Sequence, residues 1–435
     1  MNDLSAALLV VVLAAVIGRQ LLGRGPGVWT IFLAGGFATV ASGVLSVGGA
    51  EGALAAAAPV ILFLFALFLF AEALARAGAI DHLARWIVRQ SPRPEDLPAV
   101  LFLGFGLASA FLVNDALVLI GVPVLIALAA RIRTDARPLL LVLAMSVTVG
   151  SVLTPFGNPQ NLLVSVESGL SSPVYTFLRF LLVPTLINLG IGAWYLRRRF
   201  GRSLSTRAEE YDALRRSAPP LFPTSGWGRR LRQFPVLWVF PGTMLVLITV
   251  DIVAAVTQGP SVPVWETAGA GAILLVLVSP GRESLVRGVN WSILLLFVGL
   301  FLVVGGAQAG GVVPALEAVL PIPGPGHPVP ALLTIAGTSL AGPQVVSNVP
   351  WVALQIPLLT RLGYGGGTPI PWLALAGAST LAGNVTLLGA ASNLIVVELA
   401  ERQGVTIRLG EFVRVGLPLA AMTVLVLVAC LAVGW

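Results

Sequence analysis

The residues of this sequence that could do chemistry are amide and hydroxyl side chains set into two long apolar segments, SVLTPFGNPQNLLV (151–164) and GNVTLLGAASNLIV (383–396). Such side chains can bind an oxyanion or ligate a small cation. The glycines among them let the chain turn and let a ligand approach the backbone. We predict that both segments contribute to one binding site, formed by Thr154, Gly157, Asn158, Gln160, Asn161, Thr386, Gly389, Ser392 and Asn393.

The two segments are copies of one pattern. The residue types of Thr154, Gly157 and Asn161 recur 232 positions later in the second segment, and the apolar run 61–78 matches 293–310 at the same offset. A single polar break could merely satisfy backbone groups that a proline leaves exposed. Recurrence in both halves favours a binding role over that structural one.

A second pair of polar segments precedes these two. They are FLVNDALVLIGVP and VVSNVPWVALQIP, and their candidate ligand-binding residues are Asn114, Asp115, Ser347 and Asn348. Asp115 has no acidic counterpart, because Val349 occupies the equivalent position. A carboxylate near the membrane midplane is either protonated or paired with a cation, so Asp115 is the candidate coupling residue. The alternative is that the Asp115 side chain is hydrogen-bonded and has only a structural role.

Composition places these residues in a membrane. The chain is 57% hydrophobic and 10% charged, with a mean hydropathy of +0.94, which is typical of a polytopic membrane protein. One cysteine excludes an internal disulfide, and two distant histidines do not suggest a metal centre. Apolar runs of bilayer length predict ten crossings, at 4–18, 28–47, 53–78, 137–168, 172–196, 235–257, 264–280, 291–310, 371–400 and 412–434.

We therefore predict an all-α polytopic membrane protein built from two inverted repeats of five crossings each. The runs 137–168 and 371–400 are broken helices, and 97–131 and 328–360 are re-entrant hairpins. An odd number of crossings inserts the second repeat upside down relative to the first. The predicted domains are a first repeat, an Arg-rich cytoplasmic linker and a second repeat, at 1–196, 197–234 and 235–435.

Arginine placement predicts the orientation. All 26 basic residues are Arg, and an outside N-terminus and C-terminus leave only Arg179 and Arg361 on the outer side. The net charge of +7 therefore reflects topology, with anionic membrane lipid as its neighbour and no nucleic acid. Within the linker, AEEYDALRRS can form a short surface helix. The linker joins and anchors the repeats, or alternatively acts as a regulatory module. The run IDHLARWIVRQ predicts an amphipathic interfacial helix.

The TPFGNPQN element, the paired hairpins and the repeated broken helix resemble the ion transporter superfamily. That superfamily includes divalent anion/sodium symporters, arsenite permeases, proteins with a citrate transporter-like domain and sodium/proton antiporters of the D type. The resemblance covers nearly the whole chain. It implies that the hairpins and broken helices bind substrate and coupling ion, that the protein is a homodimer, and that one part moves like an elevator against a fixed scaffold.

The hairpin tips depart from the symporter pattern. Symporters of the superfamily carry Ser-Asn-Thr at both tips, whereas this chain has Val113-Asn114-Asp115 and Ser347-Asn348-Val349. The missing threonines argue against a symmetric pair of sodium sites. The run NDALVLIGVP resembles arsenite permeases, while GNPQN resembles the anion-permease branch.

The predicted function is secondary active transport of a small inorganic or carboxylic anion across a bacterial plasma membrane, without a cofactor and coupled to H⁺ or Na⁺. The expected partners are a small anionic or oxyanion substrate, membrane lipid and a second copy of the chain. The alternatives are an arsenite efflux permease and a sodium/proton antiporter. An enzyme is disfavoured, because the sequence has no metal motif, no Ser/His pair within the membrane and no nucleotide-binding loop.

Overall fold

The computed structural model describes residues 3–22, 25–204, 208–217 and 227–434, and every regular element within them is a helix. Eight helical runs in these residues are long and apolar enough to cross a membrane, which confirms the predicted all-α polytopic class. They are α3 (Val47–Arg76), α6 (Asn114–Arg131), α7 with η2 (Ala136–Leu153), α9 (Pro173–Leu204), α12 (Val236–Thr257), α15 (Trp291–Ala309), α17 with α18 (Pro328–Val346) and α22 (Leu409–Val433).

The other helices are given in chain order. In the first half they are α1 (Asp3–Leu22), α2 (Val28–Ala41), α4 (Ala79–Gln90), η1 (Pro94–Asp96), α5 (Leu97–Ser109) and α8 (Pro159–Glu167). The linker contributes α10 (Ala208–Ser217) and α11 (Trp227–Gln233). In the second half they are α13 (Val264–Val278), α14 (Arg282–Arg287), α16 (Val312–Val319), α19 (Asn348–Arg361), α20 (Pro369–Leu381), η3 (Ala382–Asn384), η4 (Leu387–Gly389) and α21 (Ala391–Arg402).

Several predicted span boundaries were wrong; α9, predicted to end at 196, continues to Leu204. The span expected over 28–47 ends at Ala41, because Gly43 adopts φ +75°, a conformation that ends a helix. The following helix begins at Val47 rather than at 53, because the hydroxyl of Ser46 accepts a hydrogen bond from the Gly49 N–H at 3.0 Å and caps it. A glycine- and alanine-rich run of low apparent hydropathy thus extends α3 to 30 residues.

Both predicted broken helices are present. Helix α7 ends in the 3₁₀ turn η2 (Ser151–Leu153), and the chain is extended at Thr154 and again at Asn158, where α8 begins. Helix α20 ends in η3, and the chain is extended at Thr386 and Ala390 before α21 begins. We call residues 151–158 the first break and residues 382–390 the second break.

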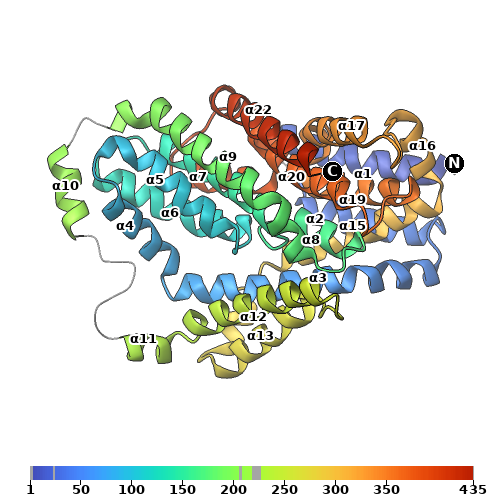
Figure 1. Cartoon of the computed structure of the whole chain (residues 1–435), viewed down its shortest axis with the longest axis horizontal. Coiled ribbons are helices and arrows are strands. Elements are labelled where there is room, and N and C mark those ends of the chain that lie inside the picture. Colours follow the sequence, from blue (N-terminus) through green and yellow to red (C-terminus); the bar gives the residue numbers. More distant parts are fainter. Residues whose placement is uncertain (1–2, 23–24, 205–207, 218–226, 435) are drawn as a thin grey trace.

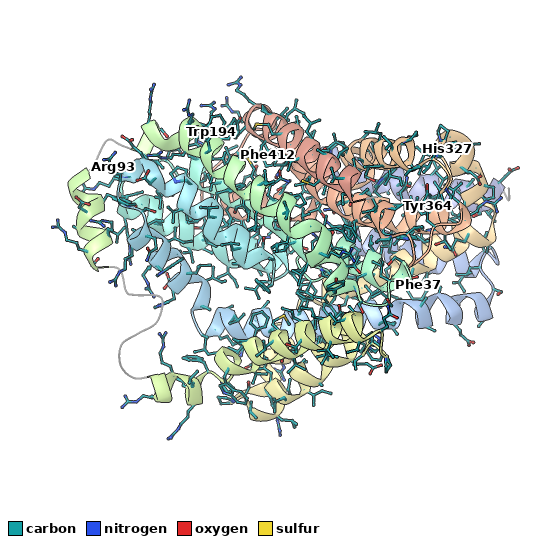
Figure 2. The ribbon with its side chains drawn as sticks, in the orientation of Figure 1. Phe37, Arg93, Trp194, His327, Tyr364 and Phe412 are labelled. Atoms are coloured by element: carbon teal, nitrogen blue, oxygen red, sulfur yellow. The ribbon has the colours of Figure 1, made fainter. Side chains whose placement is uncertain are left out.

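The breaks lie between two hairpin units. In Figure 1 the pair α5–α6 and α7 occupy one half of the molecule, and α17, α19 and α20 occupy the other. Helix α5 packs on α7 and α9, and α17 packs on α20 and α22. The second arm of each hairpin packs against the short helix that follows the break of the other repeat, α6 against α21 and α19 against α8. These reciprocal contacts place both breaks in the interior, where Figure 2 shows side chains filling the space between the ribbons.

Close helix packing depends on small residues. A Cβ atom added to Gly150 of α7 would lie 1.8 Å from the carbonyl oxygen of Gly106 on α5. Backbones approach this closely in membrane proteins because small residues remove the side chains between them. The first break is therefore held by a rigid α5–α7 pair.

The crossing number and the inverted orientation stay predictions. By length and hydropathy α6 and the α17–α18 run could themselves span a membrane, although we predict them to be hairpin arms. Figure 1 shows α10 at one end of the long axis and the N-terminus at the other. That arrangement agrees with the prediction that the linker and the N-terminus lie on opposite sides of the membrane.

Candidate functional site

Asn158 and Asn161 organise the first break. The side-chain oxygen of Asn158 accepts a hydrogen bond from the Asn161 N–H at 2.8 Å and caps α8. The side-chain amide of Asn161 donates to the carbonyl oxygens of Ser151 at 2.9 Å and Thr154 at 3.1 Å. Carbonyls at a helix end have no partner within the helix. Asn161 supplies the missing donor, which explains an amide at this position.

Thr380 of α20 connects the first break to the second half of the chain. Its hydroxyl donates to Asn161 Oδ1 at 3.1 Å and accepts from the side-chain amides of Asn158 at 3.2 Å and Gln160 at 3.1 Å. All four side chains are buried. Sequence reasoning missed Thr380, although Thr148 lies 232 positions before it and matches the repeat.

The first hairpin tip is attached to this break. The Asn114 N–H donates to the Gly157 carbonyl at 3.0 Å, and the Thr154 hydroxyl donates to the Ala110 carbonyl. A Cβ at Gly157 would lie 2.4 Å from the Ser151 carbonyl oxygen, so only glycine fits. The predicted residues Asn114, Thr154 and Gly157 therefore meet in one place.

The second break is attached to its own hairpin by Gln344, which sequence reasoning also missed. The Thr386 hydroxyl donates to Gln344 Oε1 at 2.7 Å, and Gln344 Nε2 donates to the Ala382 carbonyl at 2.9 Å. Asn393 repeats the role of Asn161, because its amide donates to the Gly383 carbonyl at 2.5 Å. A Cβ at Gly389 would lie 2.6 Å from the Ala382 carbonyl oxygen, so this position too requires glycine.

The second break and the first turn of α21 keep more buried polar atoms without a partner among the described residues than the first break and the first turn of α8, where Gln160 Oε1 is such an atom. At the second break and α21 they are both amide atoms of Asn384, the hydroxyl of Ser392 and the side-chain oxygen of Asn393. All three residues are 0% exposed. The N-cap residue of α21, Ala390, also provides no side-chain cap, whereas Asn158 caps α8. Each buried polar group left unpaired costs about 1–3 kcal/mol, so a bound ligand is the natural partner for this cluster.

Ser347 and Asn348 form the tip of the second hairpin. Ser347 has φ +69° and ψ 161°, a conformation that is nearly confined to glycine. The side-chain oxygen of Asn348 accepts from the Val349 N–H at 3.0 Å, and Ser347 lies within 3.5 Å of the same oxygen. Helix α18 contacts η4. The strained tip therefore lies against the second break, while its described side-chain hydrogen bonds stay within the tip.

Asp115 lies apart from the Asn158–Asn161 network. It lines a cavity of about 60 Å³ between α3, α6 and α21, together with Glu72, Asn290 and Ile395. Glu72 is paired with Arg76 at 2.7 Å, and Asp115 is 7% exposed. The Asp115 side chain thus lines a cavity beside α21, while the backbone of the neighbouring Asn114 is bonded to the first break.

Neither break has a charged residue near it in sequence, since 146–165 and 376–396 contain no Asp, Glu, Lys, Arg or His. Among the described residues no group of three His, Cys, Asp or Glu side chains could hold a metal ion. The polar side chains that the two breaks contribute are therefore neutral donors and acceptors.

Comparisons with known proteins point to membrane transport. Residues 6–382 match the model of the family described as "Citrate transporter". An uncharacterized transporter of Mycobacterium tuberculosis strain H37Rv is 29% identical over 373 residues, covering 84% of this chain and 83% of that one. A silicon efflux transporter of Oryza sativa subsp. japonica is 28% identical over 388 residues, covering 79% of each chain.

A solved structure shares the fold. The crystal structure of the YdaH transporter of Alcanivorax borkumensis matches with a TM-score of 0.55 and 16% sequence identity, covering 89% of this chain and 88% of that chain.

Proposed function

This chain belongs to the citrate transporter family, and we propose that within it the chain is a secondary active transporter of a small inorganic or carboxylic anion, coupled to H⁺ or Na⁺. It is a multi-pass membrane transporter rather than an enzyme. We assign it to a bacterial plasma membrane with both termini outside and the linker inside.

The observation that carries this proposal is the unpaired polar cluster at the second break. Ser392 and Asn384 offer an O–H and an N–H donor, and the uncapped first turn of α21 offers backbone N–H groups. Half-helix N-termini near the midplane attract anionic groups. The cluster therefore suits the oxygen atoms of a small oxyanion or carboxylate.

The absence of basic residues at the breaks supports ion coupling. An anion in the membrane interior is costly without a positive partner. With only neutral donors at the site, a co-transported cation or a proton would supply that charge. Asp115 is the candidate acceptor of the coupling ion, because its carboxyl group lines the cavity next to α21.

Two cavities support an elevator-type movement. The cavity at Asp115 lies where α6 and α21 face α3, and a second one of about 130 Å³ lies where α8 and α19 face α3 and α15. Ile395 and Leu163, which line one cavity each, occupy equivalent positions of the two repeats. We propose that α3 and α15 belong to the scaffold of a homodimer and that the hairpins and breaks move against it.

Proteoliposomes test this function. Purified protein is reconstituted, and uptake of a panel of oxyanions and carboxylates is measured under an imposed proton or sodium gradient. We expect one class of anion to accumulate and an ionophore to abolish the accumulation. If a correctly folded preparation moves none of the anions, by gradient-driven uptake or by counterflow, the proposal is wrong.

The second candidate function is efflux of an uncharged oxyacid, such as arsenous acid, in exchange for protons. It is favoured because the two breaks carry no charged side chain while Asp115 supplies one carboxylate. A sodium/proton antiporter is the remaining alternative. Proton efflux driven by sodium alone would identify the antiporter, and exchange that requires the oxyacid would identify the efflux permease.

A further inference from the structure

The linker helix α10 is anchored to α4 by a buried tyrosine. Tyr211 is 1% exposed, and its hydroxyl donates to the Ser91 carbonyl at 3.1 Å. Burial raises the pKa of Tyr211 to about 12, so the phenol stays protonated and keeps donating. Figure 1 shows α10 beside α4 at the end of the molecule, and Figure 2 places Arg93, which follows α4, at the same end. The linker therefore packs against the first hairpin unit.

This packing leaves a cavity of about 370 Å³ between α4, α6 and α10. Val88, Leu128 and Leu214 give it an apolar wall with one side chain from each helix. Arg85 and Arg131 also line it. A pocket that combines an apolar wall with cationic groups suits an anionic amphiphile or the phosphate group of a larger molecule.

The charges in the cavity do not cancel. Arg85 is paired with Asp81 at 2.8 Å, and Asp81 is the acidic residue that lines the cavity. Arg131, the last residue of α6, has no ion pair or hydrogen bond among the described residues. On the facing surface of α10, Arg215 is paired with Asp212 at 3.5 Å. The Arg131 guanidinium is thus available to an incoming anion.

We propose that this cavity binds a phosphate-bearing anion through Arg131, with Arg85 beside it. A guanidinium matches a phosphate with two parallel hydrogen bonds, which makes arginine the preferred residue for this group. Our topology places the cavity at the inner membrane surface, where anionic lipid headgroups are abundant. A soluble phosphate compound is the other source of the same chemistry.

Occupancy of the cavity would act on transport. Helix α6 carries Arg131 at one end and Asn114 and Asp115 at the other. A phosphate held by Arg131 beside the anchored α10 would tie the moving hairpin to the linker. The cavity lies outside the predicted transport path.

Binding to the purified, delipidated protein tests the proposal. Native mass spectrometry measures binding of phosphatidylglycerol, phosphatidylcholine and glycerol 3-phosphate to the unmodified chain and to three variants. Arg131→Gln removes the cation, Ala127→Trp fills the cavity while keeping the charge, and Arg287→Gln removes an exposed arginine elsewhere. Gel filtration and thermal melting confirm that each variant is folded.

We expect Arg131→Gln and Ala127→Trp each to weaken phosphatidylglycerol binding at least about tenfold, and Arg287→Gln to leave it unchanged. Arg131-dependent binding of phosphatidylglycerol alone identifies a lipid headgroup, and equal binding of glycerol 3-phosphate identifies the phosphate group itself. The proposal is overturned if folded Arg131→Gln or Ala127→Trp binds every probe like the unmodified chain. It is also overturned if Arg287→Gln weakens binding as much as Arg131→Gln does, or if the unmodified chain binds no probe.

Discussion

Thr380 and Asn161 stand 219 residues apart in sequence, yet the Thr380 hydroxyl donates to Asn161 Oδ1 at 3.1 Å. This hydrogen bond joins the regular part of one broken helix to the break of the other. Around it, Asn158 and Asn161 pair almost every polar group of the first break within the protein. The second break has the same backbone plan but leaves Asn384, Ser392 and Asn393 short of partners. We therefore propose that the first break mainly stabilises the fold and that the second offers ligand contacts.

Asn161→Ala should reduce stability more than it reduces ligand binding. The variant removes the donor for the Ser151 and Thr154 carbonyls and leaves the Thr380 hydroxyl without its acceptor. Groups left unpaired in the interior cost about 1–3 kcal/mol each. Thermal melting in detergent should therefore show a clear fall in Tm. An unchanged Tm with complete loss of transport would instead make Asn161 a direct ligand.

Gly150→Ala should prevent the α5–α7 pair from closing. The new methyl group would lie 1.8 Å from the Gly106 carbonyl oxygen, which is far inside van der Waals contact. We expect low yield and a lower Tm. Gly190→Ala in α9 is the matched control, because no atom lies within 4 Å of its added Cβ, and it should be neutral or slightly stabilising. Equal behaviour of the two variants would contradict the close contact.

Asp115→Asn should uncouple transport. The amide keeps the shape and hydrogen-bonding capacity of the side chain but cannot ionise, so gradient-driven accumulation should disappear while substrate counterflow persists. Glu72→Gln is the control, because Glu72 lines the same cavity but is already paired with Arg76. If Asp115→Asn still concentrates substrate with unchanged pH dependence, Asp115 is a strut and the coupling ion binds elsewhere.

The orientation can be checked with cysteines introduced at Asn2 and Ser217 in a Cys430→Ser background. The arginine distribution predicts that these positions lie on opposite sides of the membrane. An impermeant maleimide added to intact cells should label Asn2→Cys only. Labelling of both positions in intact cells would rule out the ten-crossing topology.

Much of the site could be predicted because Pro, Gly and Asn inside apolar runs are local signals of a broken helix. Asn158, Asn161 and Asn393 were found in this way. Thr380 and Gln344 were missed, because each lies on regular helix and gains its role only from contacts with a distant segment. Asn384 was missed because the first repeat has Val152 at the equivalent position, so this Asn does not recur in both halves.

The start of α3 was missed for a different reason. Hydropathy undervalues residues 47–58, which are rich in glycine and alanine and contain Glu51. The cap at Ser46 decides where the helix begins. The capping residue Ser46 therefore locates the start of α3, which hydropathy averaged over a window of residues does not.

The most direct test compares gradient-driven anion uptake by the unmodified chain and Asn384→Ala in proteoliposomes. Ser165→Ala serves as the control, because the Ser165 hydroxyl is already bonded to the Leu162 carbonyl at 2.8 Å. We predict that the unmodified chain and Ser165→Ala accumulate the anion, and that Asn384→Ala folds but loses at least about tenfold in apparent affinity, since a hydrogen bond to a charged group contributes about 1.5–3 kcal/mol. Unaltered uptake by Asn384→Ala would contradict an anion site at the second break.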